Sequence, residues 1–330
     1  MPRNSNPSRL RKLLPILALL WVVVAVAHGQ TAWRSTLYPA NWQPPGAAVS
    51  FASAKLIQDF SYAGYRRGEA LLPTITGPIF DVTQYGADPS GAADSTTAIQ
   101  SAINAAAAAG GGVVFLPAGE FRVSPQGSSS QCLRVSTSNI VIRGAGTTQT
   151  FLLNTSSNMR SKSVILVSPS STSTGTAQAI TANLPGPTRR IPVANAGSFS
   201  AGNIVRLQWN FTSEWIIENN QETWWGESSP GSATYFREVV AVDATAGWID
   251  VDVPTRYWMK TRDTPTVRTV SGLIRNVGIE SLSIGNLQHP ETGWEENDYS
   301  DTTKAAYDTH ASWLIRFQNV RDSWISDVHS

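Results

Sequence analysis

The chain has 330 residues, of which 41% are hydrophobic and 15% are charged, and its formal net charge is +1. This composition is that of a globular protein with a sizeable core, and it excludes a fibrous or disordered chain. The near-neutral charge argues against a nucleic-acid partner, which needs a basic surface. A single cysteine, Cys132, excludes an intrachain disulfide, and its apolar neighbours Leu133 and Val135 predict a buried structural thiol.

Residues 1–27 have the pattern of a signal peptide. Four basic residues precede the apolar run Leu13 to Ala27, and small side chains allow cleavage after Ala27 or Gly29. The alternative is a membrane anchor, but the run has only 15 residues, and spanning a bilayer takes about 20. We therefore predict a secreted protein without membrane association, in which 21 Lys and Arg face 24 Asp and Glu for a net charge of −3. Residues 28–78 are expected to form an N-terminal extension.

The stretch 80–124 contains strand, turn and helix signals in one unit. The elements expected in chain order are a strand over 80–85, a turn over 88–91, a helix that starts at 94–96 and ends at the glycines 110–112, and strands over 113–116 and 121–124. Asp-Pro-Ser-Gly is a turn by its own chemistry, and Asp, Ser and Thr side chains accept hydrogen bonds from free amides at a helix start. Glycine ends the helix because it tolerates the left-handed conformation.

This unit closely resembles the opening of the pectate lyase superfamily, in the branch of rhamnogalacturonase or epimerase-like, pectate lyase-like domains. The residues that carry the resemblance are Tyr85-Gly86-Ala87-Asp88, Gly91, Asp94 to Gln100, Ala102-Ile103 and Gly111 to Phe121. In that family the segment is an N-terminal helix that caps a parallel β-helix. The resemblance implies an all-β fold, a right-handed single-stranded parallel β-helix with a capping helix, and it assigns catalysis to none of these residues.

Short strands follow the helix, as expected for β-helix coils over 79–181 and again over 258–330. The segments 276–284 and 319–328 each have a polar corner followed by alternating apolar residues, which is how coils stack on their neighbours. Their offset of 43 residues exceeds one coil, so we expect the polar stretch 288–311 to loop out. The last strand runs into Ser330 without a capping element, which predicts a C-terminally truncated fragment.

Residues 182–257 are expected to form a small antiparallel β subdomain inserted between the coils. Two hairpins are predicted, one joining 190–193 with 203–207 and the other joining 237–242 with 247–253.

A cluster of aromatic and acidic residues at the tip of this insertion suits a sugar, because indole stacks on pyranose C–H groups. The candidates for substrate binding are Trp215, Trp224, Trp225 and Glu222. The alternative is that these tryptophans pack the insertion against the body of the β-helix while its glutamates form a solvated face.

Two further acidic groups are candidates for chemistry. The loop 288–311 carries six acidic residues with Trp294, and could border a polysaccharide groove, hold calcium or be simply solvated. Asp322 and Asp327, on or beside the final strand, are the candidate catalytic acid and base pair. No metal-ligand spacing is found, so no metal site is assigned.

Three functions remain open, and all but one involve a polysaccharide partner. The first is a secreted carbohydrate-active enzyme, a glycoside hydrolase or a polysaccharide lyase, which rests mostly on the resemblance. A lyase would use calcium to neutralise a uronate carboxylate, whereas few Lys and Arg cluster along the chain to hold a polyuronate, which favours hydrolysis. The second is a non-catalytic polysaccharide-binding or adhesive surface protein, and the third is a purely structural matrix protein. The oligomeric state does not follow from the sequence.

Overall fold

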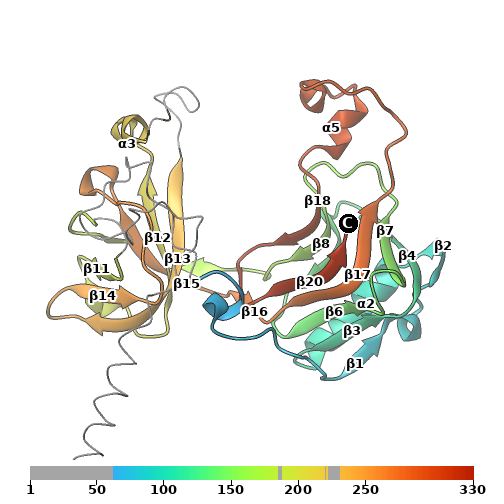
Figure 1. Cartoon of the computed structure of the whole chain (residues 1–330), viewed down its shortest axis with the longest axis horizontal. Coiled ribbons are helices and arrows are strands. Elements are labelled where there is room, and N and C mark those ends of the chain that lie inside the picture. Colours follow the sequence, from blue (N-terminus) through green and yellow to red (C-terminus); the bar gives the residue numbers. More distant parts are fainter. Residues whose placement is uncertain (1–61, 185–187, 220, 222–230) are drawn as a thin grey trace, which may run out of the picture. The chain divides into compact units, whose positions relative to one another are not determined.

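The computed structural model describes residues 62–184, 188–219, 221 and 231–330, all within the compact unit Asp59–Ser330. The predicted signal peptide lies outside these residues. The described chain is mostly β, with a set of parallel sheets and a separate antiparallel sheet (Figure 1). None of its described helices is long and apolar enough to cross a membrane.

The parallel sheets, here called the coil stack, are built from strands that recur along the chain. One run consists of β1 (Ile79–Asp81), β3 (Gly112–Leu116), β6 (Ile140–Gly144), β17 (Gly278–Asn286) and β20 (Trp324–His329). A second run consists of β2 (Ser90–Asp94), β4 (Gly119–Val123), β7 (Thr150–Asn154) and the far half of β17. The remaining parallel pairs join β5 (Gln131–Val135), β8 (Ser163–Val167) and β18 (Trp313–Phe317), and β16 (Ile274–Arg275) with β19 (Val320–Arg321). This pairing is consistent with the predicted parallel β-helix, whose hand stays a prediction.

The predicted helix is present as α2 (Thr96–Ala108). Its buried face, which includes Ile99 and Ile103, joins the main hydrophobic core beside β3 and β5. Gly112 then has a left-handed φ of 150°, and a Cβ there would lie 2.5 Å from the carbonyl oxygen of Pro78. Only glycine fits, which explains why the helix gives way to β3 at this point.

The predicted strand over 80–85 is wrong beyond its second residue. β1 ends at Asp81 and a 3-10 turn, η2 (Val82–Tyr85), follows. The Asp81 carboxylate accepts hydrogen bonds from the backbone N–H and the hydroxyl of Thr83, and this local capping competes with the strand ladder. The predicted turn at 88–91 is held by Asp88, whose carboxylate accepts from the amides of Ser90, Ala92 and Ala93.

One corner of the coil stack is a ladder of Asn139, Asn276 and Asp322, with left-handed φ values of 65°, 55° and 48°. Asn276 donates its side-chain amide to Asn139 and its backbone N–H to the carbonyl of Asp322. Asn and Asp tolerate this conformation better than other non-glycine residues. Asn276 therefore stacks on Asp322 and not on Asn319, so the predicted offset of 43 residues is wrong by three. Asn319 lies at the corner before Asp322 along the chain, and its Asn-Val sequence is the same as that of Asn276 and Val277.

The predicted burial of Cys132 is confirmed, with 5% of the residue exposed. Burial, with a smaller contribution from the charge of Asp94, raises the pKa of its thiol to about 12. The thiolate is the reactive species, so its fraction near neutral pH is very small. We expect the native protein not to react with a thiol reagent at about pH 8, and to react fully in denaturant. Fast labelling of the native protein would contradict this assignment.

The antiparallel sheet, here called the inserted sheet, contains more strands than the range 182–257 predicts. Its members are β9 (Ser173–Thr174), β10 (Gln178–Ala179), β11 (Arg190–Pro192), β12 (Ile204–Asn210), β13 (Ser232–Asp243), β14 (Trp248–Val251) and β15 (Thr266–Ser271). Its own core contains Trp209, Leu207 and Val239. The short helical segments elsewhere are η1 (Tyr65–Gly68), η3 (Ala196–Ser198), α3 (Ser213–Glu218), η4 (Thr261–Asp263), η5 (Asp298–Ser300) and α5 (Ala305–Thr309).

Of the two predicted hairpins, the second is confirmed and the first is wrong. β13 pairs with β14 as expected, but β11 also pairs with β14, and β12 pairs with β13 and β15. Arg190 lies opposite Asp250, forms two hydrogen bonds with its carboxylate, and lies 3.7 Å from the ring centroid of Trp248. These cross-strand contacts explain why β11 pairs with β14.

Candidate functional site: an arginine-lined cavity

A cavity of about 500 Å³, here called the arginine cavity, is lined by residues of η1, the inserted sheet and the coil stack. Its lining residues are Arg66, Arg67, Ile204, Phe236, Arg237, Glu238, Asp252, Leu273, Arg275, Asn319, Val320, Arg321 and Asp322. Five arginines and three carboxylates give this lining a formal charge of +2.

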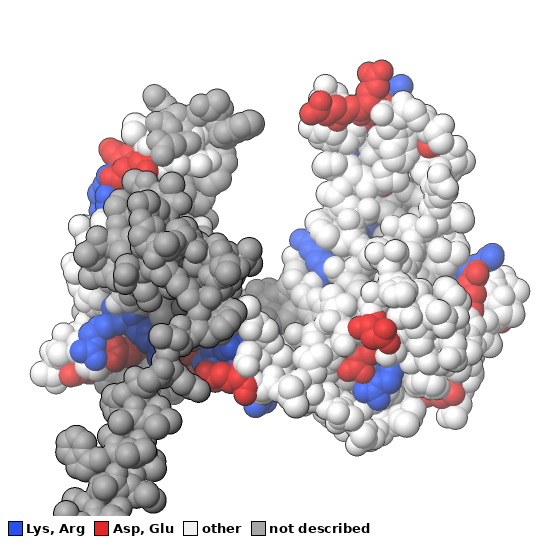
Figure 2. All heavy atoms as spheres, viewed as in Figure 1, with Lys and Arg blue, Asp and Glu red and all other residues white. Residues whose placement is uncertain are grey.

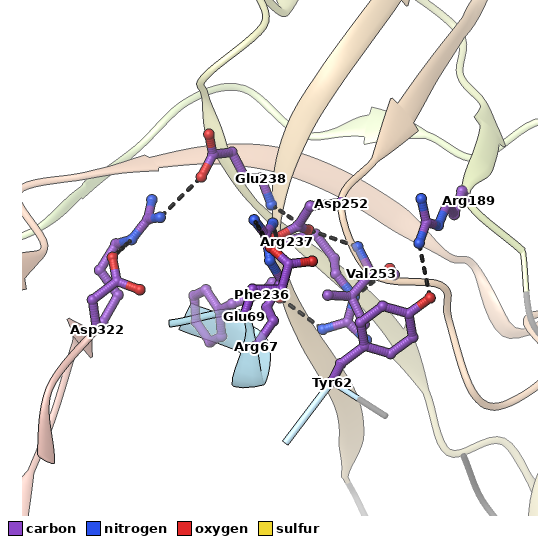
Figure 3. Close-up of polar contacts among 11 residues, drawn as sticks. Tyr62, Arg67, Glu69, Arg189, Phe236, Arg237, Glu238, Asp252, Val253 and Asp322 are labelled. Atoms are coloured by element: carbon purple, nitrogen blue, oxygen red, sulfur yellow. Dashed lines mark hydrogen bonds and ion pairs between the residues drawn. The ribbon is translucent and has the colours of Figure 1, made fainter. Parts of the chain in front are cut away.

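Ion pairs connect the separate segments around the cavity (Figure 3). Arg321 of β19 contacts Glu238 of β13 at 2.9 Å and Asp322 at 3.0 Å. Burial alone would lower the pKa of Arg321. The hydrogen bond with Glu238 and the charge of Asp322 together outweigh burial, so the pKa of Arg321 is raised above its ordinary value. Arg67 of η1 contacts Asp252 at 2.9 Å. All three carboxylates of the lining are therefore paired with arginines.

Arg237 is also a lining residue, but its side chain bonds to the protein backbone. Its guanidinium donates to the backbone carbonyls of Phe236, Val253 and Pro254. Burial is the main cause of its lowered pKa, and the nearby charge of Asp252 opposes the shift. Its hydrogen bonds to neutral carbonyls hold the lining without neutralising the charge of the arginine.

Among the arginines of the lining, Arg67 and Arg321 form ion pairs and Arg237 donates to backbone carbonyls. Within the described residues, the side chains of Arg66 and Arg275 form neither an ion pair nor a hydrogen bond. Both are exposed. Arg66 and Arg67 also have left-handed φ values of 45° and 66°, which is unfavourable for arginine. Such backbone outliers concentrate at functional sites. Together, the two uncompensated guanidinium groups make the cavity suitable for an anion.

The sequence did not indicate this site, and the expectation that few cations cluster is wrong. Its arginines come from positions 66–67, 237, 275 and 321, which only the fold brings to one cavity. Arg66-Arg67 was the one local signal, as two adjacent basic residues in a polar turn.

The structure separates the two candidate catalytic residues. Asp322 lines the arginine cavity with its carboxylate paired to Arg321, whereas Asp327 is exposed on β20 and does not line it. Their role as an acid and base pair stays a prediction.

Of the candidate sugar-binding residues, Glu222, Trp224 and Trp225 lie outside the described residues. Trp215 lies on α3, half-buried against the core of the inserted sheet, with its ring centroid 4.2 Å from that of Phe211. Trp215 thus has a packing role, but it packs within the inserted sheet and not against the coil stack. Nearby, the hydrogen bond from Arg262, with a further one from Lys260, lowers the pKa of Glu218, so this carboxylate is held ionised.

Among the side chains that the structure describes, no group of three or more His, Cys, Asp or Glu is placed to hold a metal ion.

Comparison with known proteins identifies relatives of the first coils. Residues 79–221 match the family described as rhamnogalacturonase A/epimerase, pectate lyase-like. Over 73 residues, which are 22% of this chain and 4% of the relative, the chain is 51% identical to mannuronan C5-epimerase AlgE3 of Azotobacter vinelandii. It is 45% identical over 73 residues, 22% of this chain, to alginate lyase 7 of the same bacterium, covering 8% of that protein. The matched segment spans less than a tenth of either relative.

Solved structures also match. The tailspike gp61 of Pseudomonas phage phi297 has a TM-score of 0.48 and 12% identity, over 77% of this chain and 38% of that chain. The A-module of mannuronan C-5 epimerase AlgE6 of Azotobacter vinelandii has a TM-score of 0.25 and 40% identity, over 27% of this chain and 24% of that chain. The match of residues 79–221 to the rhamnogalacturonase A/epimerase, pectate lyase-like family confirms the resemblance found in the sequence.

Proposed function

We propose that this protein is secreted and recognises an acidic polysaccharide, whose carboxylate groups bind in the arginine cavity. The observation that carries the proposal is the pair of uncompensated arginines, Arg66 and Arg275, in a lining of net positive charge. Guanidinium groups match carboxylates geometrically and form charge-assisted hydrogen bonds with them. The names of the relatives support the same ligand class, since mannuronan and alginate are uronate polymers.

Binding of the uronate carboxylate would permit chemistry at the neighbouring carbon atom. A lyase or an epimerase must abstract a proton next to a uronate carboxylate, and arginines that neutralise this carboxylate would favour that step. The arginines remove the basis for preferring hydrolysis. They also make calcium unnecessary for this neutralisation, although calcium remains compatible with a lyase.

Non-catalytic binding is the second candidate, and one observation favours it. Glu238, Asp252 and Asp322 are all engaged by arginines, so carboxylate oxygens that could take up a proton already accept hydrogen bonds. The arginine cavity is thus better suited to holding an anionic sugar than to abstracting its proton.

The test is titration of the purified protein with polymannuronate and, in parallel, with uncharged dextran. We expect polymannuronate to bind at low salt and to bind more weakly as salt rises, because salt screens exposed charges. Release of unsaturated uronate, followed by its ultraviolet absorbance, would assign a lyase, and change in C5 configuration would assign an epimerase. Binding of polymannuronate that does not weaken as salt rises, or no affinity for polymannuronate, would overturn acidic recognition.

A further inference from the structure

A second cavity, here called the loop cavity, has a volume of about 300 Å³ and lies where the loop after β17 meets the turn after β7. Its lining includes Trp294, Leu287, Asn286, Gln288, His289 and Glu291. Trp294 is 40% exposed and Leu287 is 55% exposed. Exposed apolar surface at the mouth of a polar cavity is typical of a binding site.

Polar atoms around the loop cavity retain free hydrogen-bonding capacity. The Glu291 backbone N–H donates to Nδ1 of His289, which leaves Nε2 of this imidazole to donate elsewhere. Glu291 Oε2 accepts from the backbone N–H of Ala305, and Asn286 Oδ1 accepts from Asn154. The amide N–H groups of Asn286 and the second oxygen of Glu291 therefore offer a donor and an acceptor for sugar hydroxyls.

The loop is fixed to the coil stack, so its cavity is preformed. Arg160 donates to the backbone carbonyls of Tyr299 and Tyr307, both at 2.9 Å, and lies 3.7 Å from the ring centroid of Tyr307. Met159 also donates its backbone N–H to the carbonyl of Asp308. A preformed cavity binds with a smaller entropic cost than a loop that must become ordered.

Charge distinguishes this cavity from the arginine cavity. Within the described chain, its lining has no lysine or arginine and includes the carboxylate of Glu291. Acidic side chains also gather over the α5 loop, at the upper right of Figure 2. These charges repel a uronate carboxylate, whereas indole and amide groups bind an uncharged pyranose.

We propose that the loop cavity binds an uncharged sugar unit, with Trp294 stacking on the pyranose face and Asn286, His289 and Glu291 bonding its hydroxyls. This inference rests on the proposed recognition of a polysaccharide, and it extends the ligand class to glycans with uncharged units. The loop was expected from the sequence to border a groove, hold calcium or be solvated, and the cavity supports the first of these.

The experiment is calorimetric titration with xylohexaose, cellohexaose and mannohexaose as uncharged probes. We expect at least one of them to bind, and the substitutions Trp294→Ala and His289→Ala each to weaken it, the first by about tenfold. The matched control is Tyr299→Ala, because Tyr299 is 43% exposed on the same loop but does not line the cavity. Its affinity should stay within about twofold of the wild type.

The outcomes separate the two proposals. If polymannuronate binds but none of the neutral probes does, or if Trp294→Ala leaves their affinity unchanged, the loop-cavity inference is overturned while acidic recognition stands. If a neutral probe binds through Trp294 but polymannuronate does not bind, the loop cavity is supported and acidic recognition is overturned. A protein that binds neither class overturns both.

Discussion

Replacing Arg66 and Arg275 together by alanine is expected to weaken polymannuronate binding by about a hundredfold. Each uncompensated guanidinium should contribute roughly 1.4 kcal/mol through a charge-assisted hydrogen bond, which corresponds to about tenfold in affinity. Both side chains are exposed and lack ion-pair partners among the described residues, so stability should change little. The measurement is titration of wild type and variant at one low salt concentration, with thermal unfolding as a check.

Charge alone could mimic this result, and Lys304→Ala controls for it. Lys304 is exposed on the loop beside α5 and does not line the arginine cavity. When both titrations are done at about 0.1 M salt, its removal should change affinity by less than about twofold, because the Debye length is then only about 10 Å. Equal losses from Lys304→Ala and from the arginine substitutions would show non-specific attraction and contradict the site.

Phe121→Ala is expected to lower the free energy of unfolding by about 3–5 kcal/mol, as large-to-small changes of aromatic residues in cores do. Phe121 lies on β4, is fully buried and belongs to the main core of the coil stack. The measurement is equilibrium unfolding in urea.

The neighbouring strand provides the control. Phe151 on β7, which pairs with Glu120, is 45% exposed, so Phe151→Ala should cost less than about 1 kcal/mol. Similar losses for both variants would mean that the coil interior is not the source of stability that its packing indicates.

The helix and the first coils could be predicted because their signals are local. Glycines at 110–112 stop α2 within a few residues, and apolar runs such as 140–142 form strands buried inside the stack. Two predictions were wrong where the local sequence was compatible with two structures. Asp81 caps a 3-10 turn although strand-forming residues continue after it. β11 pairs with β14, and not with β12, through the contacts of Arg190.

The candidate site could not be predicted, for a different physical reason. Arg237, Arg275 and Arg321 lie on three strands whose contact depends on the register of the whole stack, and no local pattern connects them. Sequence analysis favoured residues that form visible clusters, such as Trp215 and its neighbours, and Trp215 proved to be half-buried against the inserted core. The predicted Asp322 does reach the arginine cavity, but as the paired partner of Arg321.

The direct pairing of β6 with β17 has an evolutionary consequence. Val141 lies opposite Gly278, although the whole inserted sheet lies between them in sequence. The entropy of closing such a connection grows only logarithmically, by about 0.6 kcal/mol for each doubling of its length. A longer or shorter insertion at this junction is therefore expected to change the entropic cost of pairing β6 with β17 only slightly, so that the stacked coils can persist while the inserted segment changes.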